Sequence, residues 1–146
     1  MVALIAVLTP LQATNAGGRA DYVGGTLANL PAKTAGRIRT ADQRTFVFET
    51  EHTRVQVPYE SINLLEYGQQ AGRRYIMAIV ISPVFLLTKA RKHFLTVAYR
   101  DEEGRQQAMV FQVHKSDVRA VLAGLEARTG LKVEFQDGEA RKAGGG

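Results

Sequence analysis

HFLTVAYRDEEGRQQAMVFQVHKSDVRAVLAGLEARTG, residues His93–Gly130, is the stretch that decides the fold of this chain. Its first part predicts two strands, 92–100 and 106–114, because both segments are rich in β-branched and aromatic residues. A charged loop, Asp101–Arg105, separates them, and its Gly104 suits the positive φ that a tight hairpin needs. The pattern therefore predicts an antiparallel β-hairpin.

The second part of the same stretch predicts one amphipathic helix, Ser116–Thr129. Ser116 suits the N-cap position, and Asp117 favours the positive end of the helix dipole. Gly130 suits the left-handed position that ends many helices. Apolar side chains recur at i, i+3, i+4 and i+7, which places on one helical face Val118, Val121, Leu122 and Leu125.

Upstream of the hairpin the chain is also typical of strands. Short segments rich in β-branched and aromatic residues alternate with turn clusters at 22–28, 34–40, 45–50, 54–60 and 62–67. Leu131–Phe135 alternates again and can add a last strand. About seven strands and one helix predict a mainly β (α+β) fold, an antiparallel barrel or two-sheet sandwich capped by the C-terminal helix.

Length and composition limit the classes of protein that fit. The 146 residues are enough for one domain, and no cysteine is present. The lack of cysteine excludes disulfide frameworks, zinc fingers and iron–sulfur sites. A formal net charge of +5 favours anionic partners. Without an aromatic-lined basic face or a recognition helix, specific nucleic-acid binding is not expected.

The first sixteen residues differ from the rest because they carry no charge and contain a short apolar run, Val2–Leu8. One interpretation is a truncated signal peptide, 1–16, which implies export to the periplasm or outside the cell. The alternative is an apolar element of the domain, and a cytoplasmic protein. We expect 17–21 to be a linker, 22–135 to be the domain, and the polar, Gly-rich 136–146 to be a disordered tail.

A second unusual segment is Tyr75–Thr88, fourteen residues without a charge that are interrupted by Pro83. Cations flank it on both sides, namely Arg73, Arg74, Lys89, Arg91 and Lys92. We favour burial of this segment as two strands or a core helix. The alternative is an apolar loop that enters a lipid interface while the cations contact anionic headgroups.

Signals of catalysis are weak. None of the three serines lies in a G-x-S-x-G turn, and the three histidines lack the spacing of a metal site. The only candidates for a polar pocket are His93, His114 and Tyr99. The two histidines lie on predicted strands that can pair. We therefore expect no enzymatic activity, no cofactor and no metal.

The sequence predicts a small anion-binding cradle near the turn between the first two strands, formed by Lys33, Arg37 and Arg39. Arg37 and Arg39 point to the same side of a strand, and Lys33 can fold over them. The alternative is three solvated surface cations.

The strand order followed by a closing helix resembles the pleckstrin-homology-like superfold, particularly bacterial PH-like and GRAM-like domains. Two stretches carry the likeness: Val57–Tyr67, VPYESINLLEY, and the hairpin with its helix at 93–130. The resemblance implies a non-enzymatic binding or scaffolding module for a protein partner or an anionic membrane surface. In the lipid-binding subset a K-x(n)-[KR]-x-R pattern lies on the first two strands, and Lys33, Arg37 and Arg39 match it. The alternatives are a barrel that binds a small ligand and a structural subunit that forms homo-oligomers through its edge strands.

Overall fold

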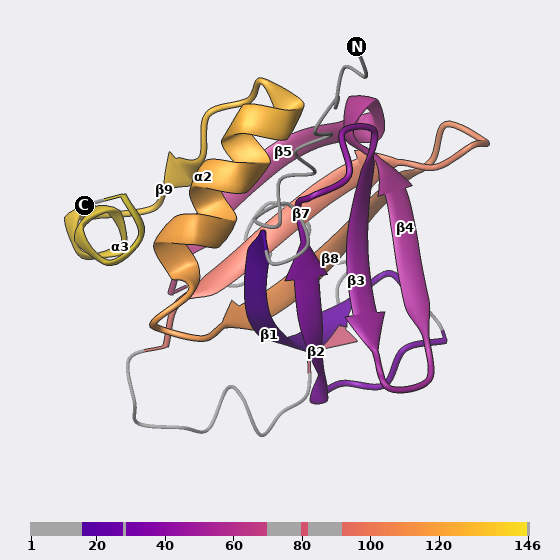
Figure 1. Ribbon diagram of the computed structural model, residues 1–146, viewed down its shortest axis with the longest axis horizontal. Coiled ribbons are helices and arrows are strands. Elements are labelled where there is room, and N and C mark those ends of the chain that lie inside the picture. Colours follow the sequence, from indigo (N-terminus) through magenta and orange to yellow (C-terminus); the bar gives the residue numbers. More distant parts are fainter. Residues whose placement is uncertain (1–15, 28, 70–79, 82–91, 146) are drawn as a thin grey trace, which may run out of the picture.

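The computed structural model describes residues 16–27, 29–69, 80–81 and 92–145. These residues form a mainly β fold in which one nine-stranded sheet is combined with two α-helices (Figure 1). The helices are α2 (Val118–Thr129) and α3 (Gly138–Gly144), and a short 3-10 helix is η2 (Tyr59–Ser61). The strands are β1 (Gly17–Gly25), β2 (Thr34–Arg39), β3 (Thr45–Thr50), β4 (Arg54–Pro58), β5 (Ile62–Gly68), β6 (Val80–Ile81), β7 (Phe94–Arg100), β8 (Gln106–Val113) and β9 (Glu134–Phe135).

Two antiparallel meanders make up the sheet. Strands β1 to β4 pair in chain order, and β5, β7 and β8 do the same. The pairing of β1 with β8 joins the two sets, and β9 adds to β5 in parallel orientation. The mainly β class predicted from the sequence is thus confirmed. In the described residues β4 and β9 are the two ends of the strand order, so one sheet curves around the core without closing (Figure 1).

The hairpin of β7 and β8 has the predicted location, and the structure adds its register. Val97 lies opposite Met109, and Arg100 lies opposite Gln106 beside the loop. Gly104 has a φ of 77°, as a tight turn requires. The Asp101 carboxylate orders the loop because it accepts hydrogen bonds from the backbone N–H groups of residues 103 and 105, at 3.0 and 2.8 Å.

The predicted apolar face of α2 is confirmed, since its four members are all buried: Val118, Val121, Leu122 and Leu125. Gly130 ends the helix in the left-handed conformation, with a φ of 74°. The predicted N-cap is wrong by one residue, because Asp117 and not Ser116 occupies that position. The Asp117 side chain does not cap its own helix. It accepts hydrogen bonds from the backbone N–H and the Nε of Arg19, which ties α2 to β1.

The far end of α2 is fixed to the turn after β2. Arg128 donates from Nε to the carbonyl of Thr40 at 2.9 Å and from Nη2 to that of Ala41 at 3.1 Å. These carbonyls belong to a turn and lack a partner in the sheet ladder, so the guanidinium satisfies them. Both ends of the helix are therefore held against the first two strands.

The main core lies between the curved sheet and α2. Phe111 of β8 is at its centre, in contact with the rings of Tyr22, Phe46 and Phe48 at centroid distances of 5.8, 6.0 and 4.9 Å. The other face of the β5–β7–β8 region is apolar as well, and two smaller buried clusters lie there: Val23, Phe94 and Val110, and Leu64, Ala98 and Ala108. The strands in this region are therefore buried on both faces.

Residues 17–21 are not the linker that their glycines suggested. They are the first half of β1, where Gly17 lies opposite Arg39 and Asp21 opposite Ala35. Gly18 is needed for close packing, because a Cβ there would lie 2.5 Å from the Cβ of Asp117. The glycines thus permit the approach of α2 to β1.

The tail also differs from the expectation of disorder, because residues 138–144 form α3. Asp137 caps this helix by accepting a hydrogen bond from the N–H of Ala140 at 2.7 Å. Ala140 is fully buried, and a Cβ on Gly144 would lie 2.6 Å from Leu122. Small residues let α3 pack closely on α2, where the polar composition alone had suggested fraying.

Several predictions fall on residues that the structure does not describe. The signal-peptide interpretation concerns 1–16, of which only Ala16 is described. Of the apolar segment 75–88, only Val80 and Ile81 are described, and they pair as β6 with Gly25 and Gly24. No helix in the described ranges is long and apolar enough to cross a membrane.

The buried tyrosines predict a loss of stability at high pH. Burial raises the pKa of Tyr22 and of Tyr59 to about 12, whereas an exposed tyrosine ionises near about 10. A group with a raised folded pKa contributes stability below its unfolded pKa, and this contribution is lost as the pH rises toward the folded value. We expect the urea midpoint to fall as the pH is raised from about 10 towards about 12. A Tyr59→Phe variant, compared with wild type in a pH series, should show a smaller fall; equal falls in both proteins would contradict the assignment.

Candidate anion-binding site

The three cations expected to form an anion cradle lie in the turn before β2 and on β2 itself. Lys33 occupies the turn before β2 with a φ of 68°, and its backbone N–H donates to the carbonyl of Tyr22. Arg37 and Arg39 lie further along the strand. Because they are two positions apart on one strand, these two arginines lie on the same face of the sheet, as the sequence predicts. A shared anion site with Lys33 stays a prediction.

Acidic side chains also reduce the charge of β2. Arg39 donates from Nε to the carboxylate of Glu49 in β3, and both side chains are partly exposed. Arg37 is in register with Arg19 on one side and with the same Glu49 on the other. This face of the sheet is mixed in charge, with arginines around one glutamate.

Four other cations predicted to bind anions, Arg73, Arg74, Lys89 and Arg91, lie outside the described residues. Lys92, the last member of that set, is described and lines a cleft. Of the eight predicted cations, it is the only one that the structure assigns to this cavity among the residues described.

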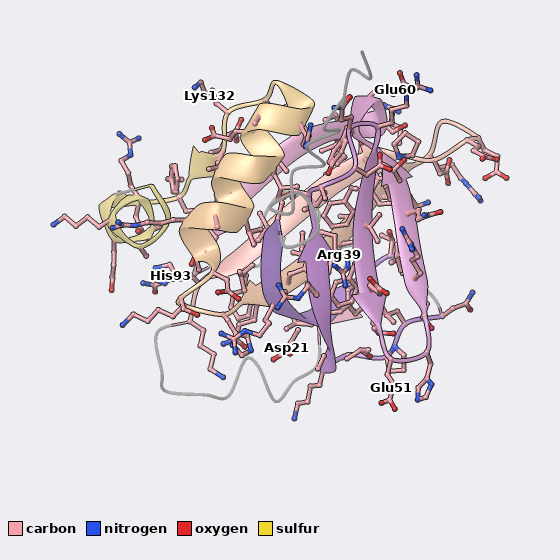
Figure 2. The ribbon with its side chains drawn as sticks, in the orientation of Figure 1. Asp21, Arg39, Glu51, Glu60, His93 and Lys132 are labelled. Carbon is pink, nitrogen blue, oxygen red and sulfur yellow. The ribbon has the colours of Figure 1, made fainter. Side chains whose placement is uncertain are left out.

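This cavity, which we call the basal cleft, has a volume of about 910 Å³. It lies where β1, β7 and β8 meet the beginning of α2, and α3 forms another wall. Figure 2 shows His93 and Asp21 at this end of the molecule, and Lys132 at the opposite end of α2. The titratable residues that line the cleft are Asp21, Lys92, His93, His114, Lys115, Arg119, Glu139 and Lys142.

Cations outnumber carboxylates in the basal cleft. Four lysine or arginine side chains, Lys92, Lys115, Arg119 and Lys142, share the lining with the carboxylates of Asp21 and Glu139. Glu139 accepts a hydrogen bond from Gln69 at 3.1 Å. With both histidines neutral, the described residues of the lining therefore carry two more positive than negative charges. Such a lining attracts anions.

The first turn of α2 adds to this attraction. Val118 and Arg119 line the cleft, and no side chain caps the first turn. The N-terminus of a helix carries a partial positive charge and N–H groups without an intrahelical acceptor. The nearby Asp117 carboxylate does not neutralise this helix end, because it is paired with the Arg19 guanidinium. A hydrogen bond from the Arg19 N–H also holds the pKa of that carboxyl below its usual range.

His93 and His114, which the sequence placed on pairing strands, line the same cleft. The ring of His93 stacks on Tyr67 with centroids 5.5 Å apart, and its Nε2 is buried without a hydrogen-bond partner. Tyr99, the third candidate, lies at the other end of β7, opposite Gln107. The structure thus brings the two histidines together and leaves the tyrosine apart.

Sequence reasoning missed most of the cleft. Lys115, Arg119 and Lys142 belong to a turn, α2 and α3, and they are separated by up to 27 positions in the chain. No local motif connects them. The one available signal was the pair of cations near the predicted helix start, Lys115 and Arg119. The apolar spacing of α2 predicts core packing and says nothing about these two side chains.

Comparison with known proteins yields no relative: no family model matches the chain, and no curated protein matches it. In the part of the chain that the structure describes, no three histidine or acidic side chains are grouped so that they could hold a metal ion. The chemistry of the basal cleft therefore rests on its cations, its histidines and the start of α2.

Proposed function

We propose that this chain is a non-enzymatic binding module of the pleckstrin-homology-like type, and that it engages an anionic membrane surface with the end that carries the basal cleft. The single observation that carries the proposal is the position of this cleft relative to the chain. Gly68, the last residue of β5, lies opposite Phe94, the first residue of β7. The apolar run and its flanking cations stand in the sequence between these two strands.

Two kinds of group support this proposal, one in the cleft and one in the sequence. The cleft supplies Lys92, Lys115, Arg119 and Lys142. The sequence supplies an apolar run, 75–88, that starts seven residues after Gly68 and ends before Lys89. A surface that combines cations with apolar side chains is suited to an anionic lipid interface, where each cation contributes about 1 kcal/mol.

The strand order supports the PH-like part of the proposal. The resemblance implies about seven short strands followed by one helix that closes the domain. Here β1–β4 and β5–β7–β8 are the two meanders, and α2 follows β8. In such modules the binding surface is built on the ends of strands and on loops, which agrees with a site at one end of the sheet.

Vesicle sedimentation tests the membrane function. We expect the full chain to bind vesicles that contain phosphatidylglycerol and to be released by salt, because the attraction is screened. Charge reversal in Arg73→Glu/Arg74→Glu should weaken binding by about 2 kcal/mol or more, about thirtyfold, at about 1 kcal/mol per cation.

The matched control reverses two cations at the opposite end of the molecule, Arg44→Glu/Lys132→Glu, with the same change in net charge. Both control side chains are exposed, and Lys132 lies far from His93 in Figure 2. Equal losses in the two variants would point to net charge alone and overturn the proposal. No binding at low salt would also overturn it, and would favour a protein partner or a self-assembling subunit.

A further inference from the structure

We infer that the basal cleft binds a dianionic phosphate group, that is, a phosphomonoester, in preference to a phosphodiester. The inference deepens the proposed membrane function, and it rests on that function only for the source of the phosphate. A phosphomonoester can belong to a lipid headgroup or to a soluble molecule, and the cleft chemistry is the same for both.

The charge of the lining selects the dianion. Lys92, Lys115, Arg119 and Lys142 face Asp21 and Glu139, so two positive charges are in excess when the histidines are neutral. A phosphomonoester carries about −1.5 to −2 charges at neutral pH, and it neutralises this excess almost completely. A phosphodiester carries one charge and leaves the other excess charge unmatched. Because Coulomb energy scales with the product of charges, the monoester is favoured.

The hydrogen-bonding groups at the cleft also suit a phosphate. Lysine and arginine donate charge-assisted hydrogen bonds to phosphate oxygens, and Arg119 can donate two in parallel. The uncapped first turn of α2 supplies backbone N–H groups and the positive end of a helix dipole on the same side.

The size of the cleft agrees with a ligand larger than the phosphate alone. A volume of about 910 Å³ is within the range of roughly 300–1,000 Å³ that is usual for small-molecule sites. A phosphate near the start of α2 leaves room for the group that it esterifies. The walls formed by β8 and α3, with Gln112 and Ala143, would contact that group.

Titration of the full chain with small phosphates tests the inference directly. NMR signals of the His93 and His114 side chains report on the cleft, and the probes are inorganic phosphate, glycerol 3-phosphate and dimethyl phosphate at pH 7.5. We expect saturable shifts with the first two probes and at least about tenfold weaker binding of dimethyl phosphate. Lys115→Gln/Arg119→Gln should weaken phosphate binding by about tenfold or more; tenfold corresponds to about 1.4 kcal/mol.

Lys132→Gln is the matched control and should bind phosphate like the wild type, because it lies at the opposite end of α2 (Figure 2). The substituted side chains of Lys115 and Arg119 are exposed, so folding should be retained, and circular dichroism checks it. Absence of a saturable shift, equal binding of the diester, or unchanged binding by Lys115→Gln/Arg119→Gln would each overturn the inference.

Vesicle binding distinguishes a lipid phosphate from a soluble one. It also distinguishes failure of the cleft inference from failure of the proposed membrane function. Stronger binding to phosphatidic acid than to phosphatidylglycerol vesicles, lost in Lys115→Gln/Arg119→Gln, would support a lipid phosphomonoester. Saturable binding of glycerol 3-phosphate without vesicle binding would support the cleft and overturn the membrane function. Vesicle binding that is unchanged in the cleft variant and insensitive to added phosphate would support the membrane function and overturn the cleft inference.

Discussion

Phe111→Ala lowers the free energy of unfolding by about 3–5 kcal/mol, which is the range for removing a fully buried phenylalanine. Phe111 has no exposed surface and contacts three other aromatic rings, Tyr22, Phe46 and Phe48. These rings all belong to the first meander, since Tyr22 is in β1 and the other two are in β3, so Phe111 of β8 packs across to the other part of the sheet. The substitution therefore leaves a cavity whose walls belong to three strands and cannot easily close.

Urea denaturation followed by circular dichroism measures this loss. The matched control is Phe135→Ala, because Phe135 packs at the margin of the same core and is only partly buried. Its cost should be clearly smaller. If the two substitutions cost the same, Phe111 would not be the centre of the core.

Leu122→Ala should cost about 2–5 kcal/mol, the usual range for a buried leucine. Leu122 is 2% exposed and is part of the main core, so α2 is held to the sheet partly by this side chain. It also lies under α3, because a Cβ on Gly144 would approach its Cδ1 to 2.6 Å. The loss should thus weaken the packing of both helices.

The control for this variant is Leu131→Ala, at a partly buried leucine just after the same helix. Its unfolding midpoint should move less than that of Leu122→Ala. In addition, hydrogen exchange at Ala140 should speed up in Leu122→Ala and not in the control. An unchanged midpoint in Leu122→Ala would show that α2 does not cover the core.

The hairpin and the helix were predictable because their signals are local. Alternation places Val97 and Met109 on one face, and Gly104 marks the turn between their strands. The spacing of Val121, Leu122 and their neighbours defines the buried side of α2 in the same way. In each case a period of the sequence corresponds to a face of an element.

The misassigned segments have a different cause, because their composition reflects tertiary packing. Gly17 and Gly18 suggested a linker, yet a Cβ at Gly17 would lie 1.9 Å from the carbonyl oxygen of Ile38. The glycines are there to admit a neighbouring strand and helix. In the tail, Ala140 and Gly144 play the same part for α3. In the sequence alone, small residues suggest a flexible segment. Only the neighbouring strand or helix in the structure shows that these positions must be small to allow close packing.

The cleft was beyond sequence reasoning for a topological reason. His93 and His114 become neighbours through the register of β7 and β8, in which Leu95 lies opposite Phe111. Lys142 joins them only because α3 packs beside α2. By contrast, a short local pattern was enough to single out Lys33, Arg37 and Arg39, which lie in the turn before β2 and on β2.

The pairing of β1 with β8 determines when the protein can fold during its biosynthesis. Eighty-eight positions separate Gly25 of β1 from Val113 of β8. At about 5–20 residues per second, a ribosome needs about 4–18 s to synthesise that interval. The meander β1–β4 can form earlier, but until β8 is made one side of β1 has free backbone groups, which are a template for aggregation. The backbone groups on that side of β1 therefore stay exposed until β8 has been translated, and α2 can cover the core only after that.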